Sequence, residues 1–432
     1  MHYVTKTGRW PAAILFSLAI AACKKNESSP PPEPRTITVS NVLQAKLLVE
    51  SGTFQGTGSP ALIQPGSSVT IQFSAAKGEA ISFATMYGNS NDLFFAPENP
   101  GIQVYDSLGS PIQGDVSSLV KLWNNGTRVE QTPGPNVVHP GVAASGNITE
   151  INGTDAYGNT FLPASSLVKA TLAYNGNSMF TLTLENISGG TANQTPLSPG
   201  VWAVSYIVGG MLLDAAPFYT SGQPSNSGIT AIAEQGNNAP LSATISAMTG
   251  IFTPLSPILV VVYDGTSNPI YTVGDYDSGK GLKALAQQGN ADTLAASLKA
   301  MPGVKHVYVL PAPETNVLLP VINGQPGGTV SQQLSVSKGD RLAIATMYGF
   351  SNDWFFATKG NGVDPTQPGD VSDSVGLFDD GTAINQFPGA GITQFNLAGT
   401  PLATRAPITA VPNPNAFTTL PAIQDIISVT LQ

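Results

Sequence analysis

Short runs of alternating apolar and polar residues, interrupted every few positions by glycine or proline, dominate this chain. In one such run polar residues separate Val69, Ile71 and Phe73, the period of two expected of a strand with one buried face. A Pro-Gly pair at 65–66 precedes the run and a Lys-Gly pair at 77–78 follows it, and such pairs are typical of turns. The pattern predicts an all-β fold of antiparallel strands with only short helices.

The run belongs to a repeated block. Residues 65–96 align without a gap to residues 326–357, and 18 of the 32 positions are identical. Both blocks pass through "ATMYG-SND" and then turn aromatic, so that Asp92 and Asp353 hold equivalent positions. Farther along, "GDVSSLVKLWNNGT" is matched by "GDVSDSVGLFDDGT". We therefore expect two copies of one β-domain.

A different pair of segments lies between the two blocks. Residues 195–237 resemble residues 253–290, and each segment carries a Leu-Ser-Pro turn, a strand and a short helix ending at Gly236 or Gly289, since glycine is a common helix C-cap. We expect domain 1 at 37–250 and domain 2 at 251–432. The order of the segments suggests that domain 1 is a circular permutation of domain 2. A predicted hairpin over 168–186, turning at Asn175-Gly176, would then join strands that are last and first in the other copy.

The N-terminus predicts export. Residues 1–22 have a positively charged start and an apolar stretch, and they end on Ile-Ala-Ala before Cys23, the single cysteine. This arrangement resembles a bacterial lipoprotein signal, in which the cysteine is acylated and becomes the mature N-terminus. An ordinary signal peptide with an incidental cysteine is the alternative. Residues 23–36 are polar and proline-rich and read as a spacer. Lys24, rather than an aspartate, follows the cysteine, which resembles an outer-membrane address.

Composition narrows the choice of partners. Charged residues make up 10% of the 432 positions and the formal net charge is −9, and no Lys/Arg cluster is present. Nucleic acid is therefore not an expected partner. No stretch after the signal has the roughly 20 uninterrupted apolar residues of a membrane-spanning helix.

Taken together, these motifs resemble the spondin N-terminal domain family. The resemblance rests on the Ser-Pro turns at 198–199 and 256–257, the Ala-Glu-Gln-Gly segment at 233–236, both "ATMYG-SND" blocks and the "NNGT" and "DDGT" turns. It covers most of residues 37–432. It implies two antiparallel β-sandwiches of the calcium-binding, C2-like type, with ion ligands in loops at one end.

The resemblance also implies metal ligands. In the second copy it places a calcium ion at Asp353 and Asp379. Ala383 stands where the family has a further acidic residue, and we expect the adjacent Asp380 to compensate for it. Calcium takes six to eight oxygen ligands, so such a loop cluster suits it.

In the first copy the matching positions are Asp92 and Asn124, with Arg128 at the further acidic position and Glu130 out of register. The fixed positive charge of Arg128 opposes a cation there. We therefore expect the calcium site in domain 2 in preference to domain 1. The alternative is that Asp92 and Asp353 cap loops by accepting backbone N–H groups, as we also expect of Asp115 and Asp370.

The sequence offers little catalytic chemistry. Only His139 and His306 lie outside the signal, and no nucleophile-elbow, zinc-protease or phosphate-loop motif occurs. The function we expect is a lipid-anchored, non-enzymatic binding or adhesion protein of the cell envelope, with a protein or glycan ligand. The alternatives are an envelope hydrolase, which would need a cleft flanked by two carboxylates, and a structural spacer.

Overall fold

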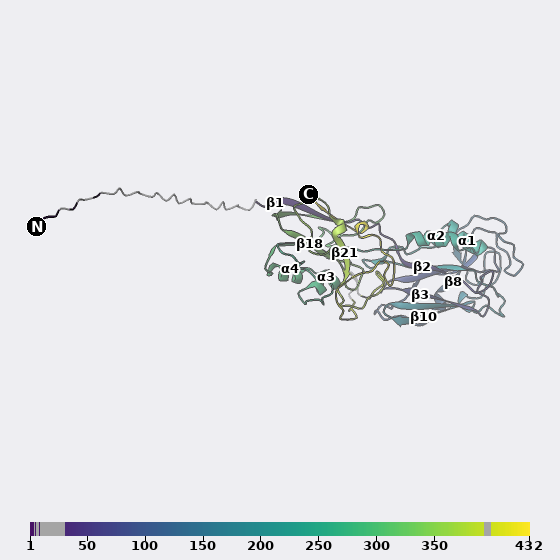
Figure 1. The fold of residues 1–432 in the computed structure, drawn as a ribbon. Helices are drawn as coiled ribbons and strands as arrows, with labels where there is room; N and C mark the ends of the chain where they lie inside the picture. Colours follow the sequence, from purple (N-terminus) through teal and green to yellow (C-terminus); the bar gives the residue numbers. More distant parts are fainter. Residues whose placement is uncertain (4, 6–7, 9–30, 393–398) are drawn as a thin grey trace.

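A computed structural model describes residues 1–3, 5, 8, 31–392 and 399–432. Strands hold 35% of the residues and helices 11%, so the predicted all-β class is confirmed. The strands form two β-sandwiches that lie end to end (Figure 1). Cys23 and most of the predicted signal and spacer lie outside the described residues. Within the described part, no helix is long and apolar enough to cross a membrane.

The first sandwich has a smaller and a larger sheet. The smaller sheet has the order β3 (Ser68–Ser74), β11 (Met179–Asn186), β10 (Val168–Gly176), β7 (Gly114–Asp115). The larger sheet has the order β2 (Leu48–Phe54), β12 (Gly200–Ser205), β4 (Ala80–Met86), β5 (Leu93–Pro97), β8 (Val120–Asn124), β9 (Thr149–Glu150), with β6 (Ile102–Gln103) beside β4. Three further elements are the β13 (Ile207–Val208) and β14 (Met211–Leu212) hairpin and the helices α1 (Ser227–Gln235) and α2 (Ala239–Met248).

The second sandwich repeats this plan. Its smaller sheet has the order β17 (Thr329–Val336), β1 (Glu33–Asn41), β23 (Ile427–Leu431), β20 (Gly369–Asp370). Its larger sheet has the order β16 (Val304–Leu310), β15 (Ile258–Tyr263), β18 (Arg341–Met347), β19 (Trp354–Thr358), β21 (Val375–Asp379), β22 (Thr409–Ala410). Its helices are α3 (Leu282–Gln288) and α4 (Asp292–Lys299). Single 3-10 turns lie at Ser117–Leu119, Ala164–Ser166, Ser372–Ser374 and Ile423–Asp425.

Strand β1 differs from the predicted boundaries. Residues 33–36 were expected in the spacer and residues 37–41 in domain 1, but this segment pairs with β17 on one side and β23 on the other. Ile37 and Val39 are fully buried in the second sandwich. The polar and proline-rich sequence before Arg35 hides the start of the alternation, and no local pattern indicates which sheet a strand joins.

The position of β1 in the second sandwich also bears on the order of the repeated segments along the chain. In the first sandwich, β10 and β11 are consecutive strands of one hairpin. In the second, the same two places in the sheet are held by β23 and β1, the last and first strands of the chain. This is the strand correspondence that a circular permutation produces. The segment carrying β12, α1 and α2 belongs to the same sandwich as β4, with which β12 pairs.

The hairpin turn itself lies two residues later than predicted. Asn177 and Ser178 have φ of 54° and 62°, and positive φ at both central residues is typical of a type I′ turn. Gly176, with φ of 87°, lies at the register shift between the strands. The predicted helix C-caps are confirmed, because Gly236 and Gly289 are both left-handed and each closes its helix with two backbone hydrogen bonds.

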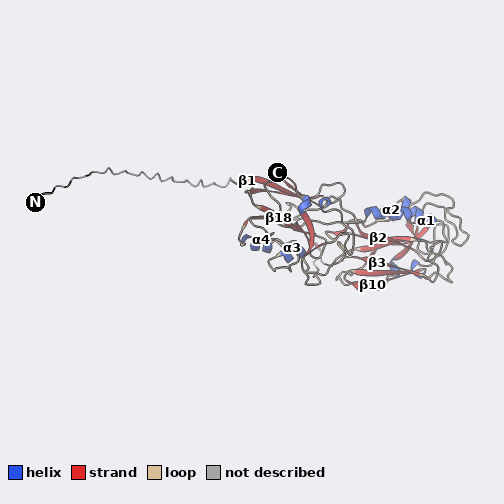
Figure 2. Cartoon of the chain, viewed as in Figure 1, coloured by secondary structure: helices blue, strands red, loops and turns tan. Residues whose placement is uncertain are grey.

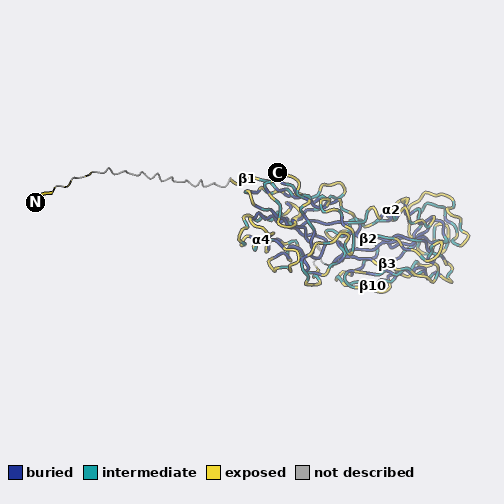
Figure 3. The backbone as a smooth tube through the Cα atoms, viewed as in Figure 1, coloured by how far each residue is buried: buried dark blue, intermediate teal, exposed yellow. Residues whose placement is uncertain are grey.

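The core explains which strands alternate and which do not. The larger sheets lie between the smaller sheets and the helices (Figure 2), so β4 is buried at all seven positions. Strands of the smaller sheets have one exposed face and alternate, as β10 does. Exposed positions gather in the loops and turns (Figure 3). The aromatic residues after Asp92 and Asp353 are therefore buried on both faces of their strands.

Candidate functional site

Each repeated aspartate lies in a loop that faces a second loop. We call this region the aspartate end: residues 87–92 and 124–135 in the first sandwich, and residues 348–353 and 379–390 in the second. Equivalent bonds join the loops. The Asn91 side chain donates to the Val129 carbonyl at 2.7 Å, and the Asn352 side chain donates to the Ile384 carbonyl at the same distance. The two ends therefore share one framework and differ in a few side chains.

Both aspartates bind the loop opposite them. Oδ2 of Asp92 accepts the backbone N–H groups of Thr127 and Arg128 at 3.0 and 2.9 Å. Oδ2 of Asp353 accepts those of Thr382 and Ala383 at 2.7 and 2.8 Å. In each residue Oδ1 is buried without a hydrogen-bond partner. Oδ2 of each aspartate thus caps the opposite loop, as the alternative predicts. Oδ1 of each aspartate has no partner and could bind a ligand.

The second sandwich brings another carboxylate to this place. Asp380 is fully buried, and its Oδ2 lies 3.0 Å from the Thr382 hydroxyl, which is also 3.2 Å from Oδ2 of Asp353. One hydroxyl proton serves only one of these acceptors at a time, and Oδ1 of Asp380 has no partner. Burial, followed by the charge of Asp277, raises the pKa of Asp380 to about 7. Burial, followed by the charge of Asp379, raises the pKa of Asp353 to about 6.

The two remaining predicted ligands are engaged elsewhere. Asp379 accepts the Gly381 N–H at 2.7 Å through Oδ1 and the Asn385 amide through Oδ2. Its counterpart Asn124 accepts the Gly126 N–H at 2.6 Å and donates to Glu130. Both side chains therefore cap the turn that carries them. The free oxygens belong to Asp353 and Asp380, and Asp379 contributes its charge.

The first sandwich places a cation beside its carboxylates. The Arg128 guanidinium lies 2.6 Å from Oε2 of Glu234, and these side chains are 20% and 4% exposed. At the equivalent places the second sandwich has Ala383 and Gln287. The sequence identified Arg128 as an obstacle to a metal but missed Glu234, its partner on α1. The available signal was the paired change between copies, Arg with Glu in one and Ala with Gln in the other.

The two ends fit a calcium ion differently. In the described residues no three His, Cys, Asp or Glu side chains are grouped as a ready metal site. The second sandwich nonetheless has two buried carboxylates with free oxygens, Asp353 and Asp380. The charges that act on them from the described residues are those of other aspartates. The first sandwich does not fit, because Asn125 replaces Asp380 and Arg128 supplies the positive charge.

Other predicted side chains have structural roles. Oδ1 of Asp115 accepts both the N–H of Ser117 at 2.8 Å and its hydroxyl at 2.5 Å. Asp370 holds Ser372 in the same way, at 2.8 and 2.6 Å. These local bonds confirm the loop-capping prediction for both aspartates.

A polar pocket of about 320 Å³ lies beside α3 in the second sandwich. Asp264 and Asp275 line it together with Lys280 and Tyr276. An envelope hydrolase would need two carboxylates beside a cleft, and this pocket has two. The hydrolase alternative stays a prediction.

Comparison with protein-family models gave no match to this chain, and comparison with curated proteins gave none either. The likeness to spondin domains therefore rests on the motifs given above.

Proposed function

We propose that this chain is a lipid-anchored binding or adhesion protein of the bacterial cell envelope, built from two spondin-like sandwiches with a calcium site in the second. The observation that carries the proposal is the end-to-end arrangement. The aspartate end of the second sandwich packs against the first, through Phe350 on Tyr206 and through Gln386 on Ser178. Among the described residues, no hydrogen bond or ring contact joins the aspartate end of the first sandwich to the second sandwich, and Val138 and Val142, which follow this end in the chain, are exposed apolar residues.

The start of β1 and the free end lie on opposite sides of this arrangement (Figure 1). Cys23 precedes β1 by ten positions, and β1 belongs to the second sandwich, the one farther from the free end (Figure 1). A spacer of that length reaches at most about 30–35 Å. Acylation of Cys23 would hold the second sandwich near the membrane and present the first sandwich outward, as suits a binding protein.

Replacement of the anchoring cysteine tests the proposal. We expect Cys23→Ser to move the protein from the membrane fraction to the soluble exported fraction, because one residue carries the whole attachment. Fractionation and labelling with a radioactive fatty acid measure this. Lys24→Asp is the matched variant, and it should keep the lipid while changing the membrane reached. Membrane retention of unlabelled Cys23→Ser would overturn the proposal.

Calcium binding is tested separately by calorimetric titration and thermal unfolding of the purified chain. Binding to the folded state alone stabilises it by about 2.7 kcal/mol at a hundredfold excess over the dissociation constant. When bound, the ion would neutralise Asp353 and Asp380. We expect Asp380→Asn, which copies Asn125, to remove the stabilisation, while Asp92→Ala retains it. An unmutated chain that calcium does not stabilise would refute the site.

A further inference from the structure

A pocket of about 620 Å³ opens beside the free aspartate end of the first sandwich. Its volume lies within the roughly 300–1,000 Å³ of ligand pockets. The walls come from segments far apart in the chain and include Pro60, Pro140, Pro196 and Pro199, with Leu62 and Met86 between them. Most of this surface is apolar and rigid, so a ligand loses little to reorganisation of the walls.

The pocket walls carry few free polar groups. Proline has no backbone N–H group, so four of the lining residues offer only carbonyl oxygens and CH groups. Two side chains with N–H donors, His139 and Gln235, also line the pocket, while other polar groups of the walls bond within the protein. The Gly88 N–H binds the Pro196 carbonyl at 2.9 Å, and the Ser198 hydroxyl donates to the Pro199 carbonyl at 2.7 Å. The polar chemistry of the pocket is therefore confined to a few side chains, of which Glu234 is the carboxylate.

The charge beneath the pocket is negative. Glu234 lines the pocket, is 3% exposed, and has one oxygen, Oε1, without a partner. Its ion pair with Arg128 leaves a net negative charge here, because the charge of Asp92 also acts on the Arg128 side chain. One guanidinium thus faces two carboxylates in a region of low dielectric, where uncompensated charge acts strongly.

We propose that this pocket binds the lysine side chain of a protein ligand, with the alkyl chain between the prolines and the ammonium group toward Glu234. The apolar walls are complementary to the alkyl chain, and the unpartnered oxygen of Glu234 is complementary to the ammonium group. This deepens the binding role proposed above by naming the ligand's chemistry, and it rests on that role.

Methionine-methyl NMR of the purified chain tests the proposal, because Met86 lines the pocket and Met347 is its counterpart in the second sandwich. The probe is lysine with blocked backbone ends. We expect saturable movement of the Met86 signal, with a dissociation constant of about 1 mM, and none of Met347. The same compound with an acetylated side-chain amine should give no shift. Leucine amide, which carries a free α-amine, should also give none.

Two variants and one control sharpen the result. Glu234→Gln should weaken binding by about tenfold, because Arg128 then has one carboxylate fewer to face. Ala61→Trp, a half-exposed position on the pocket wall, should abolish binding without touching the ion pair. Gln287→Glu, the matched position in the second sandwich, should leave the affinity unchanged. Equal shifts from the acetylated compound, stronger binding of leucine amide, or no shift at all would each overturn the assignment. If lysine binding fails while membrane retention still depends on Cys23, the lysine assignment is wrong and the proposed envelope-binding function still stands.

Discussion

The chain is expected to be several kcal/mol more stable to unfolding at pH 5 than at pH 8, because two glutamates are buried beside each other in the first sandwich. Glu50 on β2 accepts the Ser74 N–H at 2.6 Å, and Glu79 accepts the Ala76 N–H at 2.7 Å. Glu79 is fully buried, and its second oxygen has no partner. Burial raises the pKa of Glu50 to about 7 and the pKa of Glu79 well above its ordinary value.

The direction follows from proton linkage. In the unfolded chain both carboxyls ionise near 4.5, whereas in the folded chain they keep their protons to higher pH. Stability is therefore fully present below about pH 4.5 and is lost as the pH rises through the folded pKa values. For Glu50 alone the loss amounts to about 3 kcal/mol, at 1.36 kcal/mol for each pKa unit. The buried Asp353 and Asp380 act in the same direction.

Urea unfolding between pH 5 and pH 8 measures the effect. Glu79→Gln keeps the shape and the bond to Ala76 but has no proton to lose, so it should flatten the profile and stabilise the chain at pH 8. The matched control is Asp340→Asn. Asp340 holds the place of Glu79 in the second sandwich and pairs with Lys305. This substitution should destabilise the chain without flattening the dependence of its stability on pH. A Glu79→Gln profile as steep as that of the unmutated chain would contradict the explanation.

Sequence patterns predicted what depends on neighbours in the chain. Alternation at Val69, Ile71 and Phe73 indicated β3, and Gly236 and Gly289 indicated the helix ends, because these features are fixed by local backbone geometry. The repeat predicted two copies of one sandwich, and the aspartates at 92 and 353 do lie in equivalent environments.

What the sequence did not predict depends on contacts between distant residues. The pairing of β1 with β17 joins segments almost 300 positions apart, and the Arg128–Glu234 ion pair joins residues 106 positions apart. Glu79 follows a Lys-Gly turn and has the pattern of an exposed turn residue, yet the packing of the first sandwich covers it. In each case the pairing or burial of a residue depends on residues that are distant in the chain and close in the fold.

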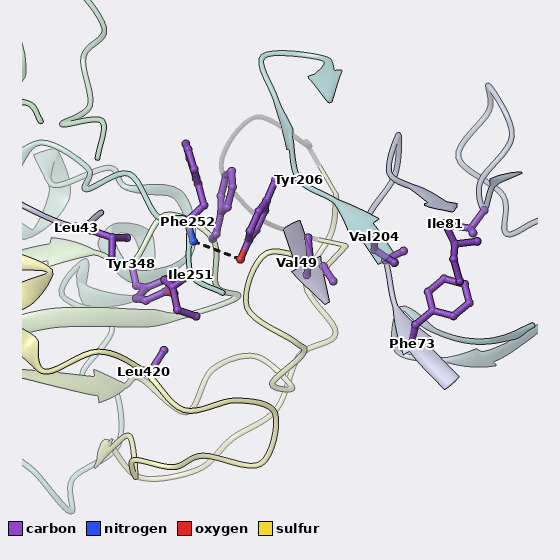
Figure 4. Packing of buried hydrophobic residues seen from close by; sticks show 14 of the residues in the cluster. Leu43, Val49, Phe73, Ile81, Val204, Tyr206, Ile251, Phe252, Tyr348 and Leu420 are labelled. Carbon is purple, nitrogen blue, oxygen red and sulfur yellow. Dashed lines mark hydrogen bonds between the residues drawn. The ribbon is translucent and has the colours of Figure 1, made fainter. Parts of the chain in front are cut away.

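The interface between the sandwiches gives the last prediction. Phe350 is 2% exposed, and its ring stacks on Tyr206 with centroids 5.7 Å apart and on Phe252 at 5.1 Å. Figure 4 shows Tyr206 beside Phe252, whose N–H donates to the Tyr206 hydroxyl at 3.3 Å. The equivalent residue at the free end of the first sandwich is Asn89. The aspartate end that packs therefore has phenylalanine at this position, and the aspartate end that stays open has asparagine.

Phe350→Asn is accordingly expected to separate the sandwiches. Truncation of a buried phenylalanine costs about 3–5 kcal/mol, and part of that energy is lost at the interface, where the ring stacks on Tyr206. Thermal unfolding should change from one transition to two, and small-angle scattering should show a longer particle. Phe350→Leu, which keeps an apolar contact, should show a smaller effect, and Asn89→Phe should leave unfolding unchanged because its end faces no neighbour. A single unshifted transition in Phe350→Asn would mean that the remaining contacts hold the sandwiches together. The aromatic stack would then not be what distinguishes the packed end from the free one.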